Sequence, residues 1–146
     1  MNDTSLTSRL DDLIGYNLRR ASALMMSDFG DMFAKTFLRP TSFSVACVID
    51  EQPGITSAEI CRLLGLQRAN IVALLAELDE HDIILRRDDE EDKRIQRLYL
   101  NPERRSELAS WRGMAAQHEE RMLARLSAQE RSLFLDMLRR IWREQA

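Results

Sequence analysis

Three side chains that can hydrogen-bond to the edges of DNA bases stand close together at Gln67, Arg68 and Asn70. An arginine can donate two parallel hydrogen bonds to guanine, and glutamine or asparagine can pair with adenine. Ala69 and Ala73 are one helical turn apart and small enough to let a helix backbone approach a duplex closely. We therefore predict that Gln67, Arg68, Asn70 and Ala73 face bases in a major groove.

Residues suited to the DNA backbone lie on both sides of this group. Hydroxyls precede it at Thr56 and Ser57, and basic side chains follow it at Arg86 and Lys93. Both kinds of group commonly contact phosphate oxygens. We predict phosphate contacts for all four residues.

Two short helices are expected to position these side chains. Thr56 and Glu59 form a Thr-x-x-Glu capping box, which begins the first helix. Gly65 ends it, because glycine takes a positive φ at no steric cost. A second helix is predicted from about residue 67 to residue 81. Its apolar inner face consists of Ile71, Leu74, Leu75 and Leu78.

A two-stranded hairpin is predicted next. Residues 83–87 have strand character, residues 88–93 are a charged turn, and residues 94–100 are the return strand. Ile55 is expected to form a very short third strand before the first helix. This order of elements is that of a winged helix-turn-helix, whose second helix enters the major groove. Arginines near the tip of such a wing suit the phosphate backbone or the adjacent minor groove.

The stretch GITSAEICRLLGLQRANIVALLAELDEHDIILRRDDEEDKRIQRLYL resembles the winged helix-turn-helix of the MarR family of bacterial transcription regulators. Asp92-Lys93-Arg94 matches the Asp-x-Arg element of that family. The resemblance implies that Asp92 supports the wing by steadying Arg94, which reaches the minor groove. It extends over nearly the whole chain, since the flanking segments fit the helical dimerisation parts of the family.

Three positions depart from the family. Gln67 stands where Asp or Ser is common, which weakens the N-cap of the second helix. Asp82 stands where glycine is usual, and Asp tolerates the left-handed conformation better than most residues. Glu77 replaces a residue that is often basic, which removes one phosphate contact. These departures affect the DNA sequence and affinity more than the fold.

Long helices are predicted on both sides of the winged helix. Residues 5–37 carry apolar side chains at spacings of three and four, with a bend expected near Gly30. Residues 39–42 form a helix boundary, with Thr41 or Ser42 as the cap of the next helix. The seam of the first helix consists of Leu6, Leu10, Leu13, Asn17, Ala21 and Leu24, continued by Met25, Phe29, Met32 and Phe33.

The C-terminal part shows two further helix starts. Asn101 and Pro102 predict a helix that runs to about Leu126. Ser127 and Glu130 form a second capping box. The last helix is predicted to bury its apolar side, which consists of Leu133, Phe134, Met137, Leu138, Ile141 and Trp142.

The fold class that follows is mainly α with a small β-hairpin wing. We divide the chain into an N-terminal dimerisation region (1–38), a winged helix-turn-helix DNA-binding domain (39–101) and C-terminal dimerisation helices (102–146). A two-fold homodimer would present two recognition helices about 34 Å apart to a pseudo-palindromic operator in double-stranded DNA.

Composition sets limits on partners. A length of 146 residues suggests one compact subunit, and a formal net charge of −3 gives no general excess of positive charge for binding DNA. Affinity must therefore depend on local arginines, geometry and dimerisation. The apolar runs are too short to cross a membrane, and the N-terminus lacks a secretory pattern, which predicts the cytoplasm.

Enzymatic chemistry is not indicated. The sequence has no Gly-x-Ser-x-Gly, glycine-rich phosphate loop, Cys-x-x-Cys or His-Glu-x-x-His, so we predict no catalytic residue, cofactor or metal. Cys47 and Cys61 are interpreted as small buried hydrophobes, with a thiol redox switch as the alternative. His81 and His118 are interpreted as solvated groups on helix surfaces.

A regulator needs an input signal. Residues 15–22 and 39–42 resemble the MarR subset that senses CoA thioesters of aromatic acids. Arginines there could pair with a carboxylate or phosphate, and aromatic side chains could form an adaptable apolar wall. The alternative is that the aromatic residues are ordinary core and the arginines a solvated face. The candidate effector residues are Tyr16, Arg19, Arg20, Phe29, Arg39 and Ser42.

Together these features predict a homodimeric, ligand-responsive repressor of an aromatic-compound catabolic operon, released by an aromatic acid or its CoA thioester. Two alternatives stay open: a winged-helix protein-interaction module without DNA binding, favoured by the acidic balance and Glu77, and a redox-sensing regulator.

Overall fold

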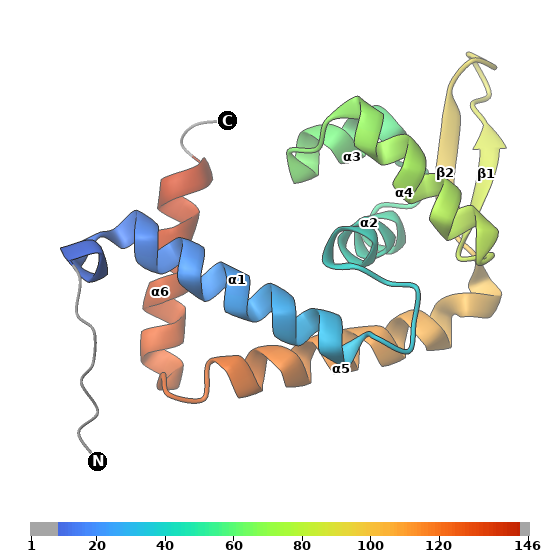
Figure 1. Ribbon diagram of the computed structural model, residues 1–146. Coiled ribbons are helices and arrows are strands. Elements are labelled where there is room, and N and C mark those ends of the chain that lie inside the picture. Colours follow the sequence, from blue (N-terminus) through green and yellow to red (C-terminus); the bar gives the residue numbers. More distant parts are fainter. Residues whose placement is uncertain (1–8, 144–146) are drawn as a thin grey trace.

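The computed structural model describes residues 9–143, as a chain of helices interrupted by one antiparallel hairpin (Figure 1). The described elements, in order, are η1 (Arg9–Asp12), α1 (Ile14–Met32), α2 (Pro40–Glu51), α3 (Ser57–Leu64), α4 (Arg68–Glu80), β1 (Ile84–Asp88), β2 (Gln96–Leu100), η2 (Pro102–Arg104), α5 (Arg105–Met122) and α6 (Ala128–Arg143).

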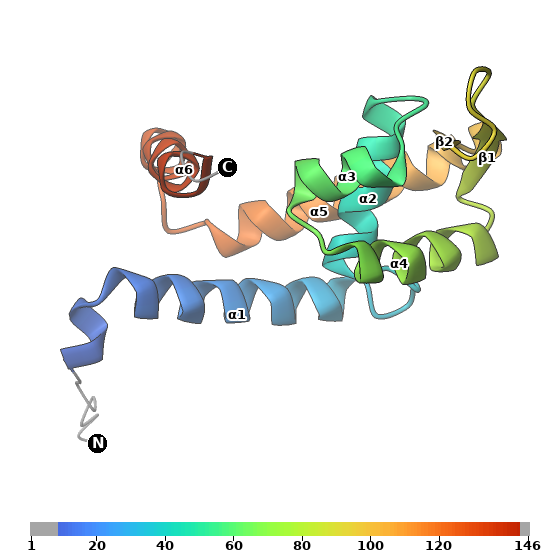
Figure 2. The ribbon, with the colours of Figure 1, turned by 90° about the horizontal axis from the view of Figure 1, so that it is seen from above.

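The elements form two groups connected by α5. At one end α2, α3, α4 and the hairpin gather into a winged helix-turn-helix (Figures 1 and 2). Helix α5 runs from the base of the hairpin to the other end of the molecule and packs against α1 and α2 on the way. Beyond it, α6 stands clear of the winged helix in both views. The mainly α fold with a hairpin wing, predicted from the sequence, is confirmed.

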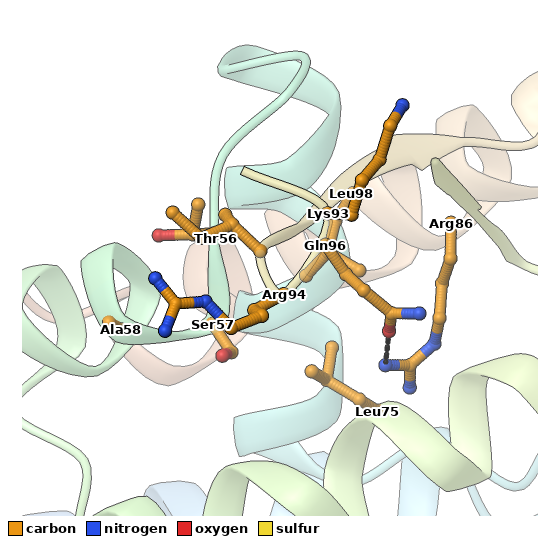
Figure 3. Close-up of a pocket in the computed structure, with 10 residues that line it drawn as sticks. Thr56, Ser57, Ala58, Leu75, Arg86, Lys93, Arg94, Gln96 and Leu98 are labelled. Atoms are coloured by element: carbon orange, nitrogen blue, oxygen red, sulfur yellow. Dashed lines mark hydrogen bonds between the residues drawn. The ribbon is translucent and has the colours of Figure 1, made fainter. Parts of the chain in front are cut away.

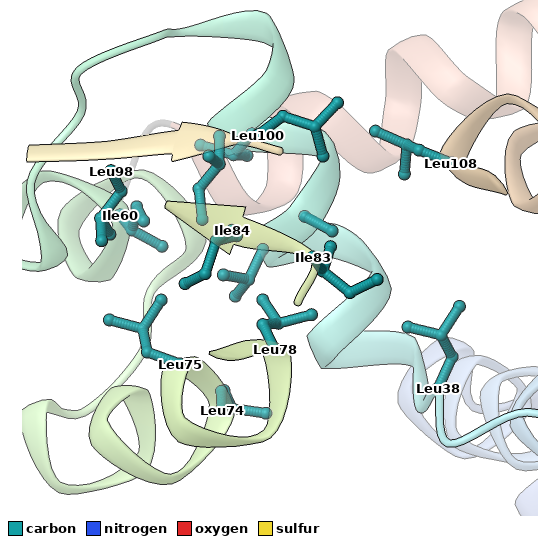
Figure 4. Close-up of a cluster of buried hydrophobic side chains, with 14 of the residues drawn as sticks. Leu38, Ile60, Leu74, Leu75, Leu78, Ile83, Ile84, Leu98, Leu100 and Leu108 are labelled. Carbon is teal, nitrogen blue, oxygen red and sulfur yellow. The ribbon is translucent and has the colours of Figure 1, made fainter. Parts of the chain in front are cut away.

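One apolar core holds the winged helix together. It lies between the strands, the inner faces of α3 and α4, and α2 (Figure 4). Helix α2 passes through its centre, with Val45, Ala46 and Ile49 fully buried. The predicted inner face of α4 is buried throughout. The core extends to α5 through Leu108 and Trp111, so α5 is fixed to the winged helix.

The wing is a regular ribbon. Strands β1 and β2 pair in antiparallel register from Ile84 opposite Leu100 to Asp88 opposite Gln96. Ile55 adds an isolated bridge to Leu98, as predicted. Asp82 adopts a φ of 56° at the turn before β1, so the left-handed conformation expected of this position is present.

The N-terminal helix is shorter than predicted. It begins at Ile14, and residues 5–8 of the predicted helix lie outside the described residues. The amide of Asn17 donates to the carbonyl oxygens of Asp11 (2.8 Å) and Leu13 (2.9 Å), which fixes a separate turn before the helix. The helix continues through Gly30 without interruption and ends at Met32.

The start of α2 differs from the prediction as well. Arg39 occupies the N-cap and Pro40 the first helical position, so neither Thr41 nor Ser42 is the cap. A proline is tolerated there because that N–H would be unpaired in any case. The Ser42 hydroxyl accepts the Arg39 backbone N–H (2.9 Å) and donates to the Arg39 carbonyl oxygen (3.1 Å).

The start of the return strand and the end of α5 also differ from the predicted boundaries. The return strand begins at Gln96, because Arg94 and Ile95 donate their N–H groups to Asp92 and remain in the turn. Helix α5 ends at Met122, four residues before the predicted end at Leu126.

The prediction that α6 buries its apolar side is wrong for the single chain. Leu133 is 60% exposed, Ile141 52% and Trp142 57%. The capping box of Ser127 and Glu130 forms as predicted, so the helix itself begins normally. Phe134 and Leu138 are half-buried, but no residue of α6 is fully buried within residues 9–143.

Candidate nucleic-acid interface

The helix-turn-helix is built by local signals in the sequence. Thr56 and Glu59 cap each other at the start of α3: the Thr56 N–H donates to the Glu59 carboxylate (2.8 Å), and the Glu59 N–H donates to the Thr56 hydroxyl (3.3 Å). The Thr56 N–H and the Thr56 hydroxyl (2.9 Å) both donate to the Glu59 carboxylate, which holds the pKa of Glu59 below its usual range. Gly65 ends α3 with a φ of 65°. Leu66 then donates its N–H to the Cys61 carbonyl (2.9 Å), which sets the angle of the turn into α4.

The side of α4 opposite its buried face is exposed to solvent. All four predicted base-reading residues, Gln67, Arg68, Asn70 and Ala73, are exposed. Gln67 occupies the N-cap without a side-chain hydrogen bond to the helix, in keeping with the expected poor cap. Its amide is therefore not required by α4 itself.

A groove of about 490 Å³ separates the start of α3 from the wing (Figure 3). The five predicted backbone and minor-groove residues, Thr56, Ser57, Arg86, Lys93 and Arg94, all line it. Leu75 of α4 forms part of its floor. The sequence thus brings hydroxyls from α3 and cations from the wing to one concave surface beside the recognition helix.

The tip of the wing holds Arg94 in a fixed orientation. Asp92 accepts from Arg94 Nε (3.0 Å) and from a terminal guanidinium nitrogen (2.9 Å). The Arg94 side chain nevertheless remains 90% exposed. The same hydrogen bonds lower the pKa of Asp92 and raise that of Arg94. The pairing implied by the family resemblance is present in the geometry.

Other acidic side chains of this region are also paired. Asp79 of α4 accepts from Arg86 Nε (2.8 Å), and Gln96 accepts from the same guanidinium at 3.2 Å (Figure 3). Asp89 binds Arg97, which also donates to the Gly54 carbonyl oxygen (3.0 Å). Carboxylates of the wing and of α4 therefore anchor arginines in place.

Glu77 has a role that the sequence did not reveal. Its carboxylate accepts from the guanidinium of Arg39 at 2.9 Å, which ties the N-cap of α2 to the recognition helix. The Arg39 side chain is 64% exposed. It therefore remains accessible, as a candidate for binding an anion must be.

The six candidate effector residues form separate groups. Tyr16 accepts a hydrogen bond from Arg20 (2.9 Å), and the guanidinium of Arg19 lies 5.5 Å from the same ring. Phe29 is buried, thirteen residues further along α1, which is roughly 20 Å away along the helix axis. Arg39 and Ser42 lie at the start of α2, where the fully buried Ser42 hydroxyl is already occupied.

Phe29 belongs to an aromatic cluster between α1, α2 and α5. Its ring stacks on Phe33 with centroids 4.3 Å apart, and Phe43 is tilted against both rings at 5.9 Å. The edge of His118 meets Phe29 at 5.6 Å. This cluster forms an apolar contact surface for α1.

The interpretation of His118 as a solvated surface group is wrong. His118 is 6% exposed, and its Nδ1 lies 2.7 Å from the Asp28 carboxylate, which also binds Arg121. The hydrogen bonds from His118 and Arg121 lower the pKa of Asp28. Spacing could have revealed this, because His118 follows Trp111 by seven residues on the apolar side of α5. His81 is exposed but stacks on Phe37 at 3.7 Å.

Both cysteines have the surroundings of packing residues. Cys61 is buried in the core, and Cys47 is half-buried beside it. Burial raises the pKa of the Cys47 thiol, which outweighs the opposing effect of Arg112. A raised pKa disfavours the reactive thiolate.

A wing, an exposed recognition helix and a cationic groove between the wing and the start of α3 define a DNA-binding transcription regulator of the winged helix-turn-helix class. None of the helices in residues 9–143 combines the length and hydropathy that a membrane crossing needs.

Comparison with known proteins identifies the family. Residues 38–95 match the model of the MarR family. The transcriptional repressor CouR bound to a 23-mer DNA duplex is 34% identical, with a TM-score of 0.86 over 92% of this chain and 95% of that chain. CouR bound to p-coumaroyl-CoA gives a TM-score of 0.83 at 34% identity, over 95% and 99% of the two chains. The transcriptional regulator HosA of Escherichia coli is 27% identical over 104 residues, or 71% of this chain and 77% of that protein.

This chain belongs to the MarR family of transcription regulators, so it acts by binding DNA and is not an enzyme.

Proposed function

We propose that this regulator is a homodimeric repressor of an operon for the catabolism of aromatic compounds, released from its operator by an aromatic acid or its CoA thioester. The observation that carries the proposal is the likeness to CouR, a repressor seen both with a DNA duplex and with p-coumaroyl-CoA. The identity of 34% extends over more than nine-tenths of both chains in each case.

Base reading is assigned to the start of α4. Arg68 donates to guanine, and Gln67 and Asn70 pair with adenine. Thr56, Ser57, Arg86 and Lys93 contact phosphates, and Arg94 enters the minor groove. The exposure of the α4 residues and the common groove of the others support these roles.

Dimerisation is assigned to residues 1–38 and 102–146, and DNA binding to residues 39–101. The exposed apolar side of α6 and the exposed Leu13, Ile14 and Leu24 near the start of α1 support the assignment. Such faces are normally covered in solution. A two-fold axis through them would present the two recognition helices to successive major grooves.

Effector binding is assigned to the region where α1, α2 and α5 meet. The aromatic cluster around Phe29 would supply an apolar surface once an aromatic ring displaces part of its buried packing, and Arg39, which is 64% exposed, would supply a cation for a carboxylate or phosphate. Tyr16, Arg19 and Arg20 lie too far along α1 to contact the same small acid. They suit the far end of a longer ligand such as a CoA thioester, or a ligand bound to the partner subunit.

Release from DNA follows from the contact between Arg39 and Glu77. An anionic effector that binds the Arg39 guanidinium breaks its ion pair with Glu77, which connects α2 to the recognition helix. The recognition helices of the dimer then lose the spacing that matches the operator, because the effector favours a conformation with a different spacing.

The test is a mobility-shift assay with full-length protein and the DNA upstream of its own gene. The wild type should bind this fragment, and a panel of aromatic acids and their CoA thioesters should release it. Arg68→Ala should weaken binding to this fragment far more than to random DNA, because base contacts give specificity. Absence of any DNA binding would contradict the proposal, and binding that no compound affects would contradict its effector part.

A further inference from the structure

The centre of the outward face of α4 is apolar. Ala69, Val72, Ala73 and Ala76 are all exposed, and Val72 is 68% exposed. With 3.6 residues per turn these four positions fall within an arc of about 100°. The arc lies opposite the buried inner face of α4. We call these four residues the apolar stripe.

Solvation does not account for the apolar stripe. In a chain with 31% charged residues, the exposed face of a helix is normally polar. Helix α4 does carry charges, but they lie beside the stripe or at its end. Glu77 and Asp79 are held sideways by Arg39 and Arg86 at 2.9 Å and 2.8 Å.

Polar base-reading side chains border the apolar stripe on both sides. In helical projection Arg68 lies on the flank near Asp79, and Asn70 lies on the flank near Glu77. A groove of about 290 Å³ runs along the Asn70 flank and is lined by Ala69 and Ala73 of the stripe. The stripe is therefore the middle of the surface that would contact bases, and not a separate patch.

Val72 is the member of the stripe that protrudes. The three alanines allow the helix backbone to approach a surface closely, whereas Val72 presents two methyl groups. A valine in a helix has one strongly preferred side-chain rotamer. These methyl groups are thus held in position before any partner binds.

One feature of the major groove matches such a surface. Of the four bases only thymine presents an apolar group there, its C5 methyl. We propose that the apolar stripe, with Val72 as its protruding member on the side nearer Arg68, reads thymine methyl groups, so that each operator half-site has A·T pairs between the positions contacted by Arg68 and Asn70. This inference rests on the proposed function, in that α4 must enter the major groove.

The test replaces thymine by deoxyuridine, which removes the methyl group and leaves every hydrogen-bonding group in place. The operator is first obtained by selecting duplexes from random-sequence DNA with the full-length wild type. Affinity for the thymine and deoxyuridine forms of each half-site is then measured. Loss of one buried methyl contact is expected to lower affinity roughly fourfold, or about 15-fold when one is lost from each half-site.

Two protein variants link the effect to the stripe. Val72→Ala should bind the thymine operator more weakly and the deoxyuridine operator as the wild type does, so its preference for thymine is lost. Leu63→Ala removes a comparably exposed apolar side chain from α3, 51% exposed, and should keep the preference. Thermal melting of both variants should match the wild type, because both side chains face solvent.

The outcomes separate the two levels of the argument. Failure to enrich any sequence would overturn the proposed function together with the inference. Specific binding with equal affinity for the thymine and deoxyuridine operators would overturn the inference alone. Equal loss of affinity for both operators in Val72→Ala would show that Val72 acts through the helix backbone or the sugar-phosphate chain instead of the methyl groups.

Discussion

The net charge of −3 would be expected to disfavour binding to negatively charged DNA, but individual ion pairs explain where the acidic residues are used. Carboxylates in this chain accept hydrogen bonds from arginines that would otherwise be mobile, as in the pairs of Asp92 with Arg94 and Asp79 with Arg86. Each pair reduces the local positive charge. It also orders a long side chain before binding, which lowers the entropy lost on association. The arginines are therefore held in an orientation suited to DNA, while the general electrostatic attraction of the protein to DNA is weaker.

Arg94→Ala should weaken binding to all DNA sequences by a similar factor, about tenfold or more, because a hydrogen bond to a charged group contributes roughly 1.5–3 kcal/mol. Fluorescence anisotropy with operator and random duplexes measures this. Arg87→Ala removes the same charge from β1, where Arg87 stacks over Tyr99 at 4.9 Å, and serves as the control. Equal losses in both variants would mean that only the general charge of the wing matters.

Asp28 should make the stability of the protein sensitive to acid. Hydrogen bonds from His118 and Arg121 hold its pKa below the usual 3.8. The stabilisation is therefore fully present above that value and is lost as the pH falls through the lowered pKa, since the unfolded chain takes up the proton first. Urea unfolding between pH 3 and pH 7 should show a flatter pH dependence for Asp28→Asn than for the wild type.

The matched control for this experiment is Asp31→Asn, which removes an exposed carboxylate three residues further along α1. Its pH dependence should follow the wild type. If Asp28→Asn and the wild type lose stability in parallel, the contact of Asp28 with His118 does not contribute to folding as we expect.

Individual elements were predictable where the signal is local. The box of Thr56 and Glu59, the left-handed Gly65 and the turn at Asp82 each depend on residues a few positions apart. The contact of Arg39 with Glu77 was not predictable, because 38 positions separate the two residues. The burial of His118 could have been predicted from its spacing to Trp111, but its partner Asp28, 90 positions away, could not. Residue types suggested base reading along α4, but exposure was needed to show that its apolar residues face outward.

Thr56→Ala tests the contribution of the N-cap of α3 to stability. Loss of the hydroxyl should lower the free energy of unfolding by about 1 kcal/mol, because an N–H group at the start of the helix loses its acceptor. Thr56→Ser retains the hydroxyl and should remain close to the wild type. Chemical denaturation of the three proteins measures the difference. Wild-type stability in Thr56→Ala would show that water replaces the cap at no cost.

The arrangement of the helices in the whole molecule bears on why the apolar side of α6 is exposed in the single chain. Helices α2 to α5 share one core, whereas α6 contributes no buried residue to it. Its apolar side and the start of α1 are exposed at the same end of the molecule, away from the wing (Figure 1). The order of helices in the sequence could not show this, because in the proposed homodimer the surface that covers α6 would belong to another subunit.

Ile141→Asp tests this directly, since it places a charge on the apolar side of α6 at a residue that is 52% exposed. Light scattering should give the wild type about twice the 17.0 kDa mass of the chain, and the variant a single chain. Operator affinity should fall about 100-fold or more, because two linked recognition helices bind far more tightly than one. Ser132→Asp adds the same charge nine residues earlier, roughly half a turn round the helix, and should remain dimeric. Circular dichroism must show unchanged helix content in both variants. A monomeric wild type, or an Ile141→Asp variant that stays dimeric, would contradict the assignment of α6 to the subunit interface.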